Sequence, residues 1–292
     1  MIESFIKHLR FEKRASSNTV LAYQNDLNQF ATFLSTTFSL SEPENAEHPL
    51  IRAWLISLTE SGLEPPSVNR KIACLRTFYK YLRRQEVIGK DPMMKIRVLK
   101  TKKRLPVFIK ENDMVKVLDQ ISFDTSFNGC RDRMILELLY GTGIRLSELI
   151  GLEDSKIDLR NQTIRVLGKR NKERVVPVSS SLISIIEEYK SARNREVEKK
   201  EHGQFLVTSS GDTCSARLVQ NIVKKYLAIT NSEKKSPHVL RHTYATHLLN
   251  RGAEINAVKD LLGHTSLAAT QVYTHNTMEK LKQAFDKAHP KA

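Results

Sequence analysis

Apolar side chains recur at helical spacing across the first hundred residues, and this pattern constrains the fold most. They lie three or four residues apart at Val20, Tyr23, Leu27, Phe30 and Leu34. Such spacing places side chains on one buried stripe of an amphipathic helix. Two more stripes follow, at Leu50, Trp54, Leu55 and Leu58 and at Val68, Ile72, Leu75, Tyr79 and Leu82. We therefore expect residues 1–98 to form a domain of four helices.

The charge of the chain indicates a polyanionic partner. Lys and Arg number 47 against 32 Asp and Glu, a formal net charge of +15, and such an excess favours binding to nucleic acid. Residues 49–105 alone hold 14 of these cations against 4 acidic side chains. On the last predicted helix, Arg76, Lys80 and Arg83 lie beside the apolar stripe, where they can follow a phosphate backbone. A basic face that contacts only solvent is the alternative.

The stretch KIRVLKTKKRLPVF interrupts the helical pattern. It has no helical period, and Pro106 near its end follows a basic cluster formed by Lys100, Lys102, Lys103 and Arg104. These features predict an extended linker over residues 99–107, between a first domain at 1–98 and a second at 108–292. Its cations either follow a nucleic-acid groove while two domains close around a duplex, or they only keep the linker soluble.

Length and composition restrict the protein class. A chain of 292 residues is long enough for two domains that each bury a core. No stretch approaches the roughly 18 apolar residues of a membrane span, and the first residues lack the apolar core of a signal peptide. The three cysteines are far apart in the sequence, at Cys74, Cys130 and Cys214. Their odd number and wide spacing argue against a disulfide framework or a zinc cluster. We expect a cytoplasmic protein without a membrane segment.

The second domain begins with a helix and a glycine break. The pattern predicts a helix from about Arg131 to Tyr140, a break at Gly141 and Gly143, and a new helix with Arg145 in its first turn. An arginine at a helix start either binds an anion there or pairs with a nearby acid such as Glu148.

A β-hairpin is predicted next. Ile164 and Val166 alternate with polar residues, as do Val176 and Val178 after a GKRNKE turn. Four cations lie at or near its tip, and spacing cannot choose among them: Lys169, Arg170, Lys172 and Arg174. Residues 183–229 then indicate two helices around a middle stretch without a clear pattern.

The stretch from Ser236 to His275 carries the strongest functional pattern. Ser236 can cap a helix and Pro237 suits its first position. The first turn of that helix would hold His238, and Arg241 would follow three residues later on the same side. Buried positions are expected at Leu240, Tyr244 and Leu248.

Two shorter helices are expected after this one. Ile255, Val258 and Leu261/Leu262 predict a helix ended by Gly263, and another begins near Ser266. His264 lies in the corner between them, and Tyr273 follows nine residues later. A metal site is disfavoured because His242 and His247 are five apart and do not share a helix face.

Taken together, these motifs resemble the tyrosine recombinases of the phage integrase family. The resemblance depends on five motifs: HxxR at 238–241, GH at 263–264, Tyr273 nine residues later, TGIRLSEL at 142–149 and GKxxKER in the hairpin. PHVLRHTYATHLL, LLGH and YTH are most similar to the bacterial Xer-type (XerC/XerD) recombinases. The first domain is similar to the family's core-binding domain at SVNRKIACLRTFYKYL and at Thr19, Tyr23, Asp26, Leu27 and Phe30.

The resemblance implies a fold and an active site. The fold would be mainly α with a small β-sheet, a two-domain clamp of a helical SAM-like domain and a mixed α/β catalytic domain. The implied catalytic residues are Arg145, Lys169, His238, Arg241, His264 and Tyr273. Within this set Tyr273 would be the nucleophile, Lys169 the general acid and Arg145 a contact to the scissile phosphate.

These residue types suit transfer of a DNA strand. A phenol with a pKa of about 10 needs a proton acceptor, here His238, and a positive field. Arginines and His264 can stabilise charge that grows on the phosphate without a metal ion or another cofactor. The product would be a 3′-phosphotyrosyl link that retains the energy of the broken bond. Two alternatives remain open: a DNA-binding protein of this architecture without catalysis, and a type IB topoisomerase.

The expected partner is double-stranded DNA, bound by a tetramer of this chain alone or with a sister recombinase, with a DNA translocase as a further candidate. Candidate DNA contacts are Arg76, Lys80, Arg83, Lys100, Lys102, Lys103, Arg104, Arg170 and Lys172. The tail predicts an amphipathic helix over 277–288 that either covers its own domain or docks onto a neighbouring subunit. The biological role would be chromosome dimer resolution or the integration and excision of a mobile element.

Overall fold

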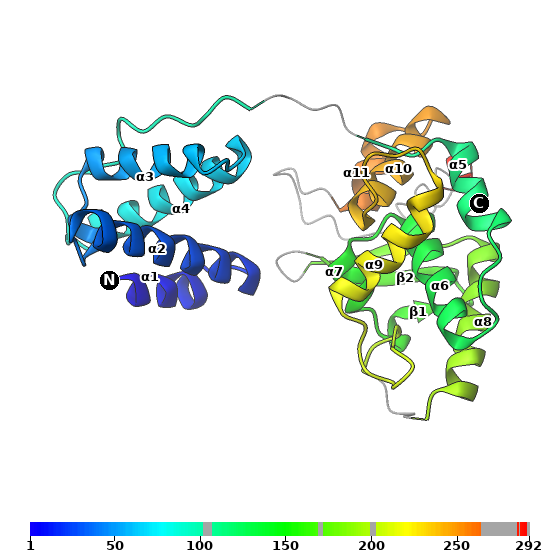
Figure 1. Cartoon of the computed structure of the whole chain (residues 1–292). Coiled ribbons are helices and arrows are strands. Elements are labelled where there is room, and N and C mark those ends of the chain that lie inside the picture. The colour runs from blue at the N-terminus through cyan, green and yellow to red at the C-terminus, as the bar shows by residue number, and fades with distance from the viewer. Residues whose placement is uncertain (102–106, 169–171, 199–202, 264–284, 286, 291–292) are drawn as a thin grey trace. The chain divides into compact units, whose positions relative to one another are not determined.

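The structure, a computed structural model, describes residues 1–101, 107–168, 172–198, 203–263, 285 and 287–290. It divides into two compact units, Met1–Arg104 and Leu105–Ala292, called here the N-terminal and C-terminal units (Figure 1). None of the described helices is both long enough and apolar enough to cross a bilayer.

The N-terminal unit is helical. It comprises α1 (Ile2–Lys7), which continues into a π-helical turn, α2 (Ser17–Phe38), α3 (His48–Glu60) and α4 (Pro65–Arg84). The predicted stripes form its core: Leu27, Phe30 and Leu34 of α2 and Val68 of α4 are fully buried, and Trp54 of α3 is 2% exposed. The prediction of four helices is confirmed for this part of the chain.

A polar cluster lies inside this core. The carboxylate of Asp26, 3% exposed, accepts a hydrogen bond of 2.7 Å from the ammonium of Lys71, and Arg70 also binds it. The Lys71 ammonium lies 5.7 Å from the centre of the Trp54 ring. Paired in this way, two charges that would be costly to bury alone tie α2 to α4.

The start of the predicted linker contacts α4. The amide side chain of Asn69 both accepts from the backbone N–H of Leu99 (2.8 Å) and donates to its carbonyl (2.9 Å). Residues 96–100 and 107–110 form neither helix nor strand, as expected for a linker. Lys102, Lys103 and Arg104 lie outside the described residues.

The C-terminal unit surrounds a central helix. Its helices are α5 (Glu111–Val115), α6 (Phe127–Thr142), α7 (Leu146–Ile150), α8 (Ser180–Glu196), α9 (Ala216–Tyr226), α10 (Pro237–Asn250) and α11 (Ile255–Leu262). Helix α6 packs against α8, α9 and α10. Nearly every side chain of α6 is buried, including Met134, Leu136 and Leu139.

A small antiparallel sheet lies beside these helices. Strands β1 (Ile157–Asp158), β2 (Thr163–Leu167) and β3 (Glu173–Pro177) follow one another in the order β1-β2-β3. Ile164 pairs with Val176 across β2 and β3, and both are fully buried. The predicted hairpin is therefore confirmed, and this sheet face belongs to the core.

Two local predictions were wrong. Helix α6 does not break at Gly141 but continues to Thr142 and ends at Gly143, whose φ is +62°. A Cβ at Gly143 would overlap the ring of Tyr244, so glycine is needed there for both its conformation and its size. Ser236 takes the cap position of α10, but its side chain makes no capping hydrogen bond.

The end of the chain packs on its own unit. Phe285 and Ala288 are each 1% exposed and join a cluster with Tyr244, Leu248 and Leu262. The described part of the tail therefore covers its own domain. Most of the helix predicted at 277–288, and the helix expected from Ser266, lie outside the described residues.

Candidate active site

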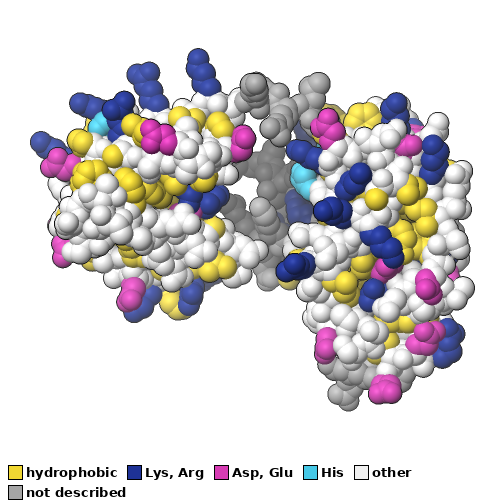
Figure 2. Space-filling model, viewed as in Figure 1, with side chains coloured by type: hydrophobic (Ala, Val, Ile, Leu, Met, Phe, Trp, Pro, Cys, Tyr) yellow, Lys and Arg dark blue, Asp and Glu magenta, His cyan; other side chains and the backbone are white. Residues whose placement is uncertain are grey.

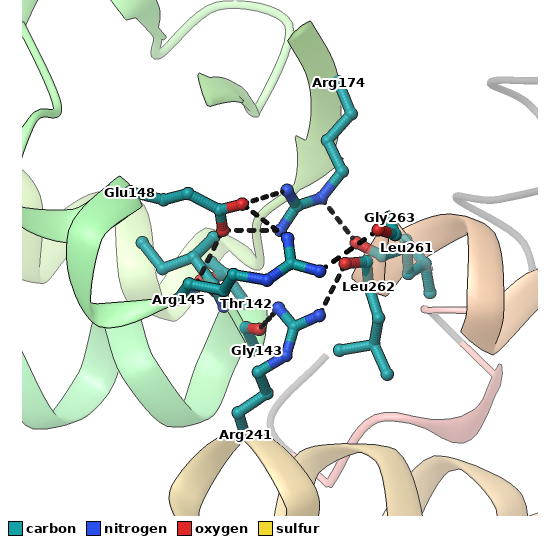
Figure 3. Close-up of polar contacts among 10 residues, drawn as sticks. Thr142, Gly143, Arg145, Glu148, Arg174, Arg241, Leu261, Leu262 and Gly263 are labelled. Atoms are coloured by element: carbon teal, nitrogen blue, oxygen red, sulfur yellow. Dashed lines mark hydrogen bonds and ion pairs between the residues drawn. The ribbon is translucent and has the colours of Figure 1, made fainter. Parts of the chain in front are cut away.

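Three arginines from separate elements converge on the end of α11 (Figure 3). Arg145 precedes α7, Arg174 lies in β3 and Arg241 in α10. Their guanidinium groups donate to three successive backbone carbonyls. The N–H···O distances are 2.9 Å from Arg174 to Leu261, 2.6 Å from Arg241 to Leu262 and 3.1 Å from Arg145 to Gly263.

These carbonyls are available because the helix ends there. The last carbonyls of an α-helix have no partner within the helix and carry partial negative charge. Gly263 ends α11 in the left-handed conformation, with a φ of +61°, as is common at helix C-termini. The three guanidinium groups thus satisfy acceptors that would otherwise remain without partners.

A buried carboxylate links two of the arginines. Glu148, whose side chain is 1% exposed, accepts from Arg174 through both oxygens, at 2.7 and 2.9 Å. It also accepts from the Arg145 side chain and backbone N–H, each at 2.7 Å. Burial raises the pKa of Glu148, but hydrogen bonds and charge from Arg174, followed by Arg145, outweigh burial and lower the pKa to about 2.

From the sequence, Arg145 was expected either to bind an anion or to pair with an acid such as Glu148. The structure shows that it pairs with Glu148. The pairing leaves 26% of the Arg145 side chain exposed. Pairing with Glu148 and partial exposure to solvent therefore occur together at Arg145.

Arg241 is the most buried of the three predicted catalytic residues that the structure describes. Only 6% of the residue is exposed, and it also donates to the carbonyl of Gly143 at 2.6 Å. Burial, followed by the neighbouring charges of Arg145 and Arg174, lowers the pKa of Arg241 to about 10. It remains protonated at neutral pH. Three guanidinium groups and one carboxylate leave two positive charges in excess, which favours binding of an anion.

His238 lies in the first turn of α10, as predicted, and is exposed. Arg241 follows three residues later, which places both side chains on neighbouring positions of the helix surface. His242, one turn beyond His238, has a pKa lowered by burial and by the nearby His238. The start of α10 thus presents two imidazoles beside the buried arginine.

Several predicted residues lie outside the described part of the chain. Among the catalytic candidates these are Lys169, His264 and Tyr273, and among the DNA contacts they include Arg170. The structure brings Arg145 and Arg241 together and places His238 on the same helix as Arg241. Gly168 and Gly263 are the last described residues before Lys169 and His264.

The burial of Arg174 was not predicted from the sequence. Arg174 was placed at or near the tip of the hairpin, and it is the second residue of β3, but its side chain is only 5% exposed. The alternation of the strand contained the signal: Arg174 is two residues before buried Val176 and therefore points to the same face. Glu148 was considered only as a possible partner of Arg145.

The predicted basic face of α4 is open to solvent. Arg76, Lys80 and Arg83 are exposed and, with Arg84 and Met94, line a hollow of about 780 Å³. Figure 2 shows Lys and Arg side chains projecting from the surface of each unit. Two further DNA candidates, Lys100 and Lys172, are also exposed.

No group of three His, Cys, Asp or Glu side chains able to hold a metal occurs among the residues that the structure describes. The three cysteines are free thiols, and Cys74 and Cys214 are buried.

Both units of the chain match known protein families. Residues 107–280 match the model of the phage integrase family, and residues 2–86 match that of the phage integrase N-terminal SAM-like domain. The chain belongs to the phage integrase family. A tyrosine recombinase XerC from Pelotomaculum thermopropionicum is 38% identical over 301 residues, spanning 100% of this chain and 98% of the relative. XerC of Oceanobacillus iheyensis is 40% identical, spanning 100% and 96%.

Solved structures of a recombinase and of an integrase share the fold. The XerH recombinase bound to a palindromic difH substrate has a TM-score of 0.73 at 22% identity, covering 97% of this chain and 84% of that one. A lambda integrase dimer bound to a core site has a TM-score of 0.68 at 17% identity, covering 91% and 94%.

The family and fold class expected from the sequence are confirmed: a mostly helical protein with a SAM-like domain and a catalytic domain that contains a small sheet. This chain is a site-specific tyrosine recombinase, an enzyme that cuts and rejoins DNA.

Proposed function

We propose that this recombinase cleaves DNA through a covalent 3′-phosphotyrosyl intermediate, with Tyr273 as the nucleophile. The observation that carries the proposal is the convergence of Arg145 and Arg241 in a cluster with an excess of positive charge. A guanidinium group has a planar fork of donors that matches two oxygens of one phosphate. Two such groups from different elements form a clamp for a single phosphodiester.

Each catalytic residue then has a distinct task. Attack of the phenol places negative charge on the non-bridging oxygens, which Arg145, Arg241 and His264 stabilise. His238 accepts the proton of Tyr273, and Lys169 protonates the departing 5′-oxygen. The P–O bond to that oxygen breaks as the bond to the phenol forms. Because the phosphotyrosyl link retains the energy of the original bond, a 5′-hydroxyl can reverse the step without ATP or another cofactor.

DNA binding is assigned to both units. The proposed organisation is a core-binding domain at 1–98, a linker at 99–107 and a catalytic domain at 108–292 that together clamp a duplex. The contacts to the phosphate backbone are assigned to the exposed side chains on α4 and to the cations of the linker and hairpin, Arg76, Lys80, Arg83, Lys100, Lys102, Lys103, Arg104, Arg170 and Lys172. The exposure of Arg76, Lys80 and Arg83 on one helix supports this assignment.

The proposed assembly is a tetramer on two DNA sites, in the cytoplasm, formed by this chain alone or with a sister recombinase. Its support is the similarity to proteins named XerC and to a lambda integrase solved as a dimer on DNA. Chromosome dimer resolution is the role that the similarity to XerC favours, with activation by a DNA translocase. Integration and excision of a mobile element is the second candidate role.

The test is to trap the intermediate on DNA. Wild-type protein and Tyr273→Phe are incubated with fragments of the source genome that carry random nicks, and complexes that survive detergent are collected and sequenced. Where a nick lies just downstream of the cleavage point, the short fragment that carries the new 5′-hydroxyl dissociates. Without this hydroxyl the cleaved strand cannot be religated. We expect wild type to yield adducts at a defined sequence and Tyr273→Phe to yield none.

The outcomes separate the candidate functions. Equal adducts from Tyr273→Phe would show that the nucleophile is misassigned. Binding without any adduct would favour a DNA-binding protein without catalysis. Loss of supercoils from plasmids that lack the mapped sequence would favour a relaxing topoisomerase.

A further inference from the structure

Arg174 is the third member of the arginine cluster but belongs to none of the assigned catalytic positions. Its two terminal nitrogens bind both oxygens of Glu148, at 2.7 and 2.9 Å, while Nε donates to the carbonyl of Leu261 at 2.9 Å. The side chain is 5% exposed. All three guanidinium nitrogens of Arg174 already donate to Glu148 or Leu261, so we expect its effect on the reaction to act through these neighbours.

Two glycines pack against this guanidinium. A Cβ added to Gly263 would lie 3.0 Å from Cδ of Arg174, and a Cβ added to Gly168 would lie 3.5 Å from Oε1 of Glu148 and 3.8 Å from Nη1 of Arg174. Gly168 closes the described hairpin, because its N–H donates to the carbonyl of Lys172 at 2.8 Å. Arg174 thus lies against three parts of the unit: Gly168 after β2, the end of α11, and Glu148.

We propose that Arg174 is a positioning residue for strand cleavage, which orients Arg145 through Glu148 and holds the β2–β3 hairpin and the end of α11 at fixed distances from that arginine. The proposal rests on the proposed function, because it assigns Arg145 to the scissile phosphate. Lys169 and His264 follow Gly168 and Gly263 directly in the sequence, so the anchors of both catalytic segments lie against Arg174.

The geometry requires arginine in particular. Three donor directions are used, one along Nε and two in the parallel fork towards the carboxylate. A lysine carries the same charge but presents it as a point, and cannot bind a carboxylate through two parallel bonds and a carbonyl at the same time. A lysine at position 174 would keep Glu148 ionised, but it would lose some of the hydrogen bonds that fix Glu148 and the end of α11 in place.

A second buried arginine provides a matched control. Arg193 of α8 is 5% exposed, binds the carboxylate of Asp154 at 2.9 Å and donates to the carbonyl of Phe205 at 2.9 Å. It therefore has the same kinds of partner as Arg174 within the same unit, but none in the arginine cluster. Loss of either side chain costs buried hydrogen bonds, whereas only loss of Arg174 disturbs Arg145.

The experiment measures single-turnover cleavage of a nicked duplex that carries the site mapped with the wild-type protein, at saturating protein. Arg174→Gln, Arg174→Lys and Arg193→Gln are compared with wild type, and each rate is divided by the folded fraction from circular dichroism. We expect Arg174→Gln to cleave roughly 10- to 100-fold more slowly, the range for misplaced catalytic groups. Arg193→Gln should cleave like wild type, and all variants should bind the duplex with an affinity within about threefold of wild type.

A pH profile distinguishes positioning from general loosening. The charged groups that face Glu148 among the described residues are Arg145, Arg174 and Arg241. Without Arg174 the carboxylate keeps its burial but loses its main partner, so the pKa of Glu148 rises. The ratio of the Arg174→Gln rate to the wild-type rate should then fall as the pH is lowered from about 8 to about 5.5. Arg174→Lys should show a smaller loss of rate without this pH dependence.

Each result decides the matter. The proposal is supported if the cleavage rate of Arg174→Gln falls further behind wild type at low pH and if the Arg174→Gln/Glu148→Gln double variant shows no such pH dependence. Equal rates per folded protein for Arg174→Gln and Arg193→Gln would overturn it, and so would full rescue by Arg174→Lys. If Arg174→Gln does not fold, the Arg174→Lys comparison alone decides. Absence of any adduct with wild type would instead contradict the proposed function.

Discussion

Replacing Glu148 by glutamine tests the electrostatics of the arginine cluster directly. The change preserves shape and removes the only carboxylate that the described residues place among Arg145, Arg174 and Arg241. Lowering the pKa of Glu148 from 4.5 to about 2 corresponds to roughly 3 kcal/mol of stabilisation of the ionised form. We therefore expect Glu148→Gln to lower the free energy of unfolding at neutral pH by about 2–4 kcal/mol.

The pH dependence of this loss has a definite sign. A carboxyl whose pKa is lowered by folding stabilises the protein fully above its unfolded pKa, and the stabilisation fades as the pH falls towards the folded pKa. The difference between wild type and Glu148→Gln should thus be constant near neutrality and shrink between about pH 5 and about pH 2.

Calorimetry of both proteins across this range provides the measurement. For a unit of this size the expected shift of Tm at neutral pH is roughly 5–15 °C. The single tryptophan, Trp54, lies in the N-terminal unit, so its fluorescence should report an unchanged transition. Exposed Glu153 is the matched control, and Glu153→Gln should stay within about 0.5 kcal/mol of wild type. A Glu148→Gln protein as stable as wild type at pH 7, or a deficit that persists in acid, would refute the reasoning.

Two further predictions concern the core and the DNA face. Gly143→Ala should lower the stability by about 2–5 kcal/mol, because the backbone is left-handed and the new methyl overlaps Tyr244. Gly252→Ala, with a φ of +87° but open space around it, should cost only about 1–2 kcal/mol in chemical denaturation; equal losses would contradict the overlap. Replacing Arg76, Lys80 and Arg83 together by alanine should reduce the slope of log affinity against log salt by about 2–3 in fluorescence anisotropy, and an unchanged slope would remove α4 from the DNA interface.

The helices of the fold were predictable because their signal is local. The stripe through Leu27, Phe30 and Leu34 lies within one helix, and its spacing alone decides which side is buried. The same holds for Leu240, Tyr244 and Leu248 of α10, all of which are fully buried. The alternation in β2 and β3 and the end of α11 at Gly263 also follow from neighbouring residues.

The predictions that were wrong depended on distant parts of the chain. Gly141 suggested a break, but α6 is held in a helical path by its burial against α8 and α10. Of these two glycines, Gly143 is the one at which a Cβ would overlap its neighbour, and that neighbour, Tyr244, lies about a hundred residues away. No local pattern contains this contact.

For the candidate site, the sequence by itself determined the residue types, their order and the family that they indicate. It identified Arg145 and Arg241 because each occurs in a recognisable motif. Only the tertiary structure decided that Arg174 is buried between Glu148 and Leu261, and that three arginines bind three successive carbonyls of α11. Spacing along a chain specifies which face a side chain occupies, but its partners come from elements that meet only when the protein folds.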